Sequence, residues 1–252
     1  MSTLPADFWT TLPLGKDVKL LTKDTNGLAA FDKPAGVLSH PNEPNEEPRA
    51  LLMCHYDEAG ECFTWRGSAN TERCLWLLNR LDSATSGVIL TAASKELAEA
   101  IKLQFAKKKV NKIYQTLVFG KPGVRFQVWR DMMAVQRKGG VVRAHTVGNV
   151  PSVTHMHYVK SAMGTFTTSL LRLEPHTGRS HQLRVQCAKR HLPIVGDQNY
   201  GNFAQNKAFA KKTNNKRLFL HSNETSFEYD FSGVACKFKA VAPLPPDFTV
   251  SY

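Results

Sequence analysis

Short apolar runs, many of them alternating with polar residues, recur along most of this 252-residue chain. Alternation with a period of two is typical of strands that bury one face. We expect strands over residues 18–21, 28–31, 75–78, 88–90, 113–119, 126–130, 153–159, 166–173, 218–221 and 234–238. Asn26-Gly27 predicts a tight hairpin turn between the first two strands, and Gly139-Gly140 and Gly164 mark later turns.

Helical spacing is rarer. Leu97, Ile101 and Phe105 recur at that spacing, after Ser94 as a predicted N-cap and before a lysine run at 107–109. A second helix is expected over 180–190 and a short one over 50–56, whereas residues 41–49 predict an exposed loop. Many strands with few helices and long antiparallel stretches indicate an α+β protein.

One stretch combines apolar runs with charge. The runs 75–78 and 88–90 enclose Arg80 and Asp82, followed by small polar residues and Gly87. A carboxylate between two core strands is costly unless it is paired or used. An aspartate that caps its own turn is the plainer interpretation, and spacing alone favours it.

Composition narrows the class of protein. Hydrophobic residues make up 42% of the chain and charged residues 21%, which is ordinary for a globular protein. No apolar run reaches the length of a membrane span, and no signal peptide is evident. The five cysteines are scattered without a C-x-x-C pair, so we expect neither disulfides nor a zinc site. We therefore expect a cytoplasmic location, where thiols stay reduced.

Positive charge is concentrated in two segments. The net charge is +12; residues 101–143 hold 11 basic and 1 acidic residue, and residues 176–217 hold 9 basic and 1 acidic. Such segments predict a polyanionic partner, most simply RNA. A solvated basic face without a partner is the alternative.

Two further places combine polar chemistry with tight backbone geometry. Tyr114 follows a lysine-rich region, although a strand tyrosine more often packs its ring than stacks on a base. In the segment 177–184, a glycine turn opens a predicted helix, and Arg179 and Arg184 could serve a phosphate or a carboxylate. An arginine near Asp82 would keep that carboxylate ionised and able to attack a glycosidic carbon.

Five segments together resemble the RluA-type pseudouridine synthases. They are residues 79–87 (Asn-Arg-Leu-Asp-Ser-Ala-Thr-Ser-Gly), 32–36 (Asp-Lys-Pro-Ala-Gly), 112–118 (Lys-Ile-Tyr-Gln-Thr-Leu-Val), 177–185 (Thr-Gly-Arg-Ser-His-Gln-Leu-Arg-Val, followed by 193–197 and 200–201) and 217–221 (Arg-Leu-Phe-Leu-His). Each is weak alone, but their shared order over residues 17–240 is specific.

The resemblance implies an enzyme that isomerises uridine in RNA, either rRNA or tRNA, without a cofactor or metal. Asp82 would be the catalytic aspartate, Tyr114 the residue stacking on the flipped base, and Arg184 the partner of Asp82. Arg80 would hold the active-site loop, and Arg179 would contact RNA. The implied fold is a long, bent, mixed and largely antiparallel sheet with flanking helices.

Two positions depart from the family pattern. Asn79 and Gln186 stand where histidines are usual, and neither can titrate near neutral pH. We expect altered RNA contacts or loop support, with the chemistry kept. An inactive RNA-binding protein of the same fold is the main alternative. A glycosidase is more distant, because it usually needs a second carboxylate and we expect none in the motifs near the site.

The organisation is expected to be simple. Residues 1–16 predict an irregular leader and residues 17–252 one catalytic domain, with no room for a separate RNA-binding domain before it. We expect a monomer.

Overall fold

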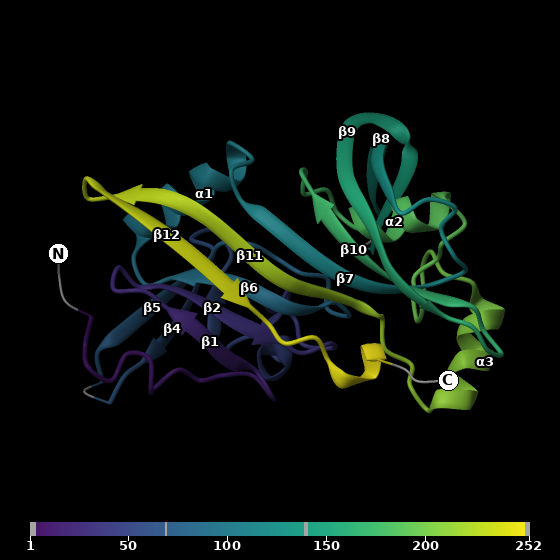
Figure 1. Cartoon of the computed structure of the whole chain (residues 1–252). Helices are drawn as coiled ribbons and strands as arrows, with labels where there is room; N and C mark the ends of the chain where they lie inside the picture. Colours follow the sequence, from purple (N-terminus) through teal and green to yellow (C-terminus); the bar gives the residue numbers. More distant parts are fainter. Residues whose placement is uncertain (1–3, 69, 139–140, 250–252) are drawn as a thin grey trace. The chain divides into compact units, whose positions relative to one another are not determined.

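Antiparallel strands build most of the structure, a computed structural model that describes residues 4–68, 70–138 and 141–249 (Figure 1). The chain divides into two units, Met1–Val110 with Glu224–Ala242 and Asn111–Asn223 with Pro243–Tyr252. Strand β11 (Leu220–Phe231) begins in the second unit and continues in the first. Strand-rich units with few helices confirm the predicted α+β class.

The first unit is built around β6 (Ser86–Ala92), a strand buried at every position. It pairs antiparallel with β2 (Leu28–Lys33) and, near its end, with β5 (Glu72–Leu77). The remaining elements are β1 (Lys19–Lys23), which pairs with β2; β3 (His55–Asp57) and β4 (Cys62–Arg66), which extend the sheet beyond β5; and β12 (Val234–Val241), which pairs with β11.

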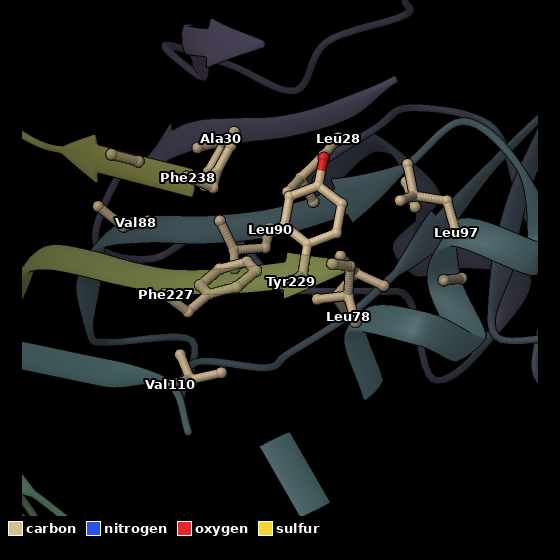
Figure 2. Close-up of a cluster of buried hydrophobic side chains, with 14 of the residues drawn as sticks. Leu28, Ala30, Leu78, Val88, Leu90, Leu97, Val110, Phe227, Tyr229 and Phe238 are labelled. Atoms are coloured by element: carbon tan, nitrogen blue, oxygen red, sulfur yellow. The ribbon is translucent and has the colours of Figure 1, made fainter. Parts of the chain in front are cut away.

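Both faces of β6 are covered, which explains its unbroken apolar run. Val88 and Leu90 pack in one buried cluster, whereas Ile89 packs in another. Figure 2 shows the first cluster, where β2 and β6 residues meet Phe227, Tyr229 and others. Helix α1 (Lys95–Ala106) contributes Leu97 to it, and its predicted cap is confirmed because Ser94 Oγ accepts from the Leu97 N–H at 3.2 Å.

The second unit places its strands in the order β7, β10, β9, β8. Their bounds are β7 (Asn111–Phe119), β8 (Phe126–Lys138), β9 (Val141–Ala162) and β10 (Thr168–Pro175). Helix α2 (Gln182–Lys189) lies on one face, where Gln186 bonds to the β9 residue Thr154. On the other face, α3 (Phe203–Thr213) buries Phe209 against Leu117 and Leu170.

Several predicted elements need correction. No helix forms over residues 50–56: Ala50 and Leu52 make isolated bridges, and β3 begins at His55. Ala50, Leu51 and Leu52 are consecutive, and all three are buried. A helix with a single apolar face could not bury three consecutive residues, whereas an extended segment can. The loop expected at 41–49 contains a 3-10 helix, Pro44–Arg49. The predicted turn at residues 139–140 lies outside the described residues.

The N-terminal leader contributes to the first unit. Phe8 is buried in the cluster that holds Ile89, and Leu14 bridges to Leu52. The predicted boundary between leader and catalytic domain at residue 17 stays a prediction. Over the ranges that the structure describes, no helix is long and apolar enough to cross a membrane.

Candidate active site

Asp82 lies in the connection between β5 and β6, in the first unit. The connection starts with two bonds to β6, since the Leu78 N–H donates to the Leu90 carbonyl at 3.0 Å and the Leu90 N–H donates to Asn79 Oδ1 at 2.7 Å. Its turn is closed through the backbone, where the Thr85 N–H donates to the Asp82 carbonyl at 2.9 Å. The Asp82 side chain is half-buried.

Two side chains from residues 33–39 hold this connection. Ser39 Oγ accepts from the Leu81 N–H at 2.9 Å and donates to the Leu81 carbonyl at 2.8 Å. The fully buried Lys33 ammonium donates to the carbonyls of Val37 at 2.6 Å and of Pro34 and Ser83 at 3.0 Å. The Asp-Lys-Pro-Ala-Gly motif therefore supports the loop that carries Asp82.

Gly36 completes that support. Its N–H donates to the Ser83 carbonyl at 2.7 Å, and its φ of +92° lies in the left-handed region that favours glycine. The sequence identified residues 32–36 as one of the five resembling segments, without a contact to the Asp82 loop. The contact of this segment with residues 81–83 spans about fifty positions, and spacing along the chain carries no signal for it.

Arg80 is anchored near the same loop. Its guanidinium donates to Glu61 Oε1 at 3.0 Å and lies 3.3 Å from His40 Nε2. Glu61 also accepts from Lys102, and the hydrogen bond and charge of Lys102, with the charge of Arg80, hold the pKa of Glu61 below its ordinary value despite partial burial. The Arg80 side chain is still 60% exposed, so it can also meet a ligand.

In the second unit, the segment 177–185 is connected to strand β9 by side-chain hydrogen bonds. Gln182 Oε1 accepts from Thr177 Oγ1 at 2.7 Å and from the Arg179 N–H at 3.1 Å, and Gln182 Nε2 donates to Thr154 Oγ1 at 2.9 Å. His181 precedes α2 with a left-handed φ of +55°, and its Nδ1 lies 2.8 Å from the Tyr200 hydroxyl. His181 thus contacts Tyr200 at the start of α2.

Arg184 is held by a second acid. Its Nε and Nη2 donate to Asp197 Oδ2 and Oδ1 at 2.9 and 2.8 Å, and both side chains are buried. Burial alone would raise the pKa of Asp197, but Arg184 and the N–H groups of Asn199 and Tyr200 outweigh it and lower that pKa. The expectation of no second acid in the motifs was wrong, because Asp197 ends the segment 193–197.

Gln186, one of the two departures from the family pattern, is fully buried. It donates to Asp131 Oδ2 at 2.8 Å and accepts from Thr154 Oγ1 at 2.6 Å. Asp131 also receives Lys189 at 2.7 Å and Arg190 at 2.9 Å. A neutral amide therefore ties α2 to β8 and β9, so the role of Gln186 is support of the fold and not RNA contact. Asn79 likewise supports its loop.

Tyr114 lies on β7, half-buried, directly across from Leu173 of β10. Leu173 pairs in turn with Met156, which is on the same side of β9 as Thr154. Tyr114 thus projects to the face that α2 covers. Burial lowers the pKa of Lys112, two residues before Tyr114, to about 8. Arg179, the remaining predicted site residue of this unit, is exposed.

The predicted site residues fall in two groups. Asp82 and Arg80 belong to the first unit, and Tyr114, Arg179 and Arg184 to the second. The pairing of Asp82 with Arg184 joins the two groups and stays a prediction. Among the described residues, no cluster of three or more His, Cys, Asp or Glu side chains could hold a metal ion.

Known proteins resemble this chain over most of its length. The family model for RNA pseudouridylate synthase matches residues 27–189. A protein of Pasteurella multocida (strain Pm70) named tRNA pseudouridine synthase C is 32% identical over 212 residues, which cover 80% of this chain and 82% of that protein. Its namesake from Haemophilus influenzae (strain ATCC 51907 / DSM 11121 / KW20 / Rd) is 33% identical over 211 residues, covering 79% and 83%.

Solved structures show the same fold. The structure titled Human RNA Pseudouridylate Synthase Domain Containing 1 superposes with a TM-score of 0.65 at 19% identity, covering 92% of this chain and 86% of the human chain. Human RNA Pseudouridylate Synthase Domain Containing 4 gives 0.63 at 21% identity, covering 91% and 89%.

Proposed function

This chain belongs to the RNA pseudouridylate synthase family, as its motifs predicted, and we propose that it isomerises uridine to pseudouridine in tRNA with Asp82 as the catalytic residue. In this reaction the bond from uracil N1 to ribose C1′ breaks and a bond from C5 to C1′ forms. The C5 hydrogen leaves to solvent and N1 takes up a proton. No redox step or group donor is needed, and we propose that no cofactor takes part.

The remaining residues receive roles by motif match. Tyr114 stacks on the displaced base, Arg184 pairs with Asp82, and Arg80 positions the loop while reaching toward RNA. Arg179 contacts the backbone of the RNA. Asp82 either attacks the sugar or promotes another step first, and the same residues serve both routes.

The choice of tRNA rests on the relatives that carry tRNA in their names. The two basic segments supply the charge that a polyanion needs. rRNA remains the second substrate class to test. We propose a monomer in the cytoplasm, since the cysteine pattern suits a reducing compartment.

The observation that carries the proposal is the construction of the Asp82 loop. Ser39 and Lys33 fix its backbone on both sides of Asp82, and Gly36 adds a third attachment. A carboxylate held this way is pre-positioned, which saves the ordering of a reacting group during catalysis. The buried ammonium of Lys33 joins the Ser83 carbonyl of the loop to the carbonyls of Pro34 and Val37 in the supporting segment, which holds the loop in place.

The test uses tRNA labelled with tritium at uridine C5. The wild type should release tritium, and Asp82→Asn should reduce release to background because the amide is a poor nucleophile and base. Asp230→Asn, an exposed aspartate on β11, is the matched control and should keep full activity.

Four outcomes would contradict the proposal or part of it. Release by Asp82→Asn at the wild-type rate would remove Asp82 from the chemistry. Binding of tRNA without release by the wild type would indicate an inactive RNA-binding protein. Free uracil in place of pseudouridine would indicate a glycosidase. Release of tritium from rRNA but not from tRNA would change the proposed substrate from tRNA to rRNA.

A further inference from the structure

One face of the second unit's sheet is buried at one end and, among the described residues, exposed around Phe126 at the other. Residues paired directly across strands project to one face, so Arg172 of β10, His157 of β9 and Phe126 of β8 lie together. This is the face opposite Tyr114, because Tyr114 pairs with Leu173, the next residue along β10. Near Leu117 the face is covered by α3, but around Phe126 it is exposed.

Aromatic rings gather on the uncovered half. The Phe126 ring, in a residue that is 50% exposed, lies 4.8 Å from the His157 ring and 5.8 Å from the His155 ring between centroids. The His155 and His176 rings are tilted by 50° with their centroids 4.1 Å apart, and His155 Nδ1 lies 3.2 Å from His176 Nε2. Three imidazoles thus support one exposed phenyl ring, and we call these four residues the ring platform.

The surroundings of the ring platform are basic. Arg130 of β8 and Arg172 of β10 are exposed, and so is Arg125, which directly precedes β8. The acid Glu174 lies among them on β10, paired with Arg172 at 2.7 Å and with His157 at 3.5 Å. Burial, with the charges of His155, Lys112 and Arg130, lowers the pKa of His176 despite Glu174. The exposed arginines carry positive charge at neutral pH.

Two other uses of such a platform fit less well. The three histidines do not form a metal-binding group among the described residues. A single exposed phenylalanine is normal on a protein surface, but this one is flanked by further rings and by guanidinium groups. Rings on a strand surface beside basic side chains are what unpaired nucleotides require, because each base offers a face for stacking and each phosphate a charge.

We propose that the ring platform is a second RNA-binding surface, on which Phe126 stacks with an unpaired base while Arg130 and Arg172 contact the adjacent phosphates. It rests on the proposed function, in that the RNA is the substrate, and it adds a contact outside the catalytic loop. Since Tyr114 projects to the opposite face, the nucleotide bound here is not the uridine that reacts.

The test measures binding of a short fluorescent oligoadenylate, which contains no uridine to react, by anisotropy over a series of salt concentrations. The wild type should bind it, and Phe126→Ala should weaken binding about five- to a hundredfold, the range that loss of one stacked base gives. Phe126→Trp should retain binding. Arg172→Gln should lower the slope of log affinity against log salt by about 0.7, as for one phosphate contact to a single strand.

Val234→Ala is the matched control, because Val234 is an apolar residue 59% exposed on β12 of the first unit. It should bind oligoadenylate like the wild type. On tRNA at saturating concentration, Phe126→Ala should keep the wild-type kcat and raise KM. Circular dichroism should show both variants folded, and since Phe126 is exposed, its truncation leaves the core intact.

The outcomes separate this surface from the proposed activity. Tritium release with unchanged oligoadenylate binding by Phe126→Ala would overturn the surface and leave the enzyme standing. Oligoadenylate binding that depends on Phe126, in a wild type that releases no tritium from tRNA, would support the surface and contradict the proposed activity. Failure of the wild type to bind oligoadenylate, or an equal loss in Val234→Ala, would also overturn the surface.

Discussion

The buried pair of Arg184 and Asp197 provides the sharpest test of how the second unit holds its site. We expect Asp197→Asn to destabilise this unit strongly. The amide keeps an oxygen for the N–H groups of Asn199 and Tyr200, but it removes the charge and replaces one acceptor of the guanidinium with a donor.

The magnitude follows from burial and geometry. Asp197 is 1% exposed and Arg184 7%, and two parallel hydrogen bonds of 2.8 and 2.9 Å join them. Breaking a buried pair by removing one charge costs about 3–5 kcal/mol, because the remaining charge keeps its desolvation penalty. The cost should fall on α2, which carries Arg184.

Urea unfolding combined with hydrogen exchange of α2 peptides measures this effect, because exchange reports the second unit even where the two units unfold separately. Glu228→Gln is the control. It removes an equally short ion pair, Glu228 to Lys237 at 2.8 Å, whose side chains are exposed, and it should leave unfolding and α2 exchange unchanged.

The pH dependence has a definite sign. Since the folded-state pKa of Asp197 is lowered, its contribution to stability is complete above its unfolded value, near 3.8, and is lost as the pH falls through the folded value. The advantage of the wild type over Asp197→Asn should thus be constant from pH 7 to about pH 5 and shrink in acid. Equal stability of Asp197→Asn and Glu228→Gln at pH 7 would refute this reasoning.

Three further substitutions probe supports of the site. Lys33→Met should cut tritium release while tRNA binding persists, because the carbonyls of Pro34, Val37 and Ser83 lose the buried donor that holds the Asp82 loop in place. Unchanged release would show that Lys33 does not hold this loop. Gly196→Ala should prevent folding of the second unit as judged by circular dichroism, since a Cβ would lie 1.7 Å from the Arg217 carbonyl oxygen; a folded variant would contradict it. Gln186→Leu should cost about 1–3 kcal/mol in urea, the penalty for buried polar groups without partners, and no loss would refute its role.

Local patterns predicted the elements that depend on local rules. Ser94 with Leu97 and Ile101 defined the start of α1, and Asn26-Gly27 placed the first hairpin, because caps, helical spacing and turns act within a few residues. Helix α3 was not predicted. Its buried side chains, Asn206 and Phe209, are too few to produce a clear apolar stripe.

The motifs named Asp82, Arg80, Tyr114 and Arg184 as candidate site residues, and their roles stay predictions. The partners that hold Arg80, Arg184 and the Asp82 loop were not predicted, because these contacts join separate segments of the chain. Lys33 reaches a carbonyl 50 positions away. Glu61 was not considered, although it anchors Arg80 from 19 positions away. Asp197 ends the matched segment 193–197, so its place in that segment was a signal in the sequence for a second acid.

Helix α2 has a consequence for how the chain tolerates mutation. The helix has only eight residues, too few to persist by its own propensity, and six of them are buried. Specific partners fix Gln182, Arg184 and Gln186, which allow little substitution, while the exposed Arg179 carries no such constraint on its side chain. A saturation mutagenesis scan should therefore find intolerance concentrated at the buried positions of α2, with Arg179 sensitive only when RNA is the selection.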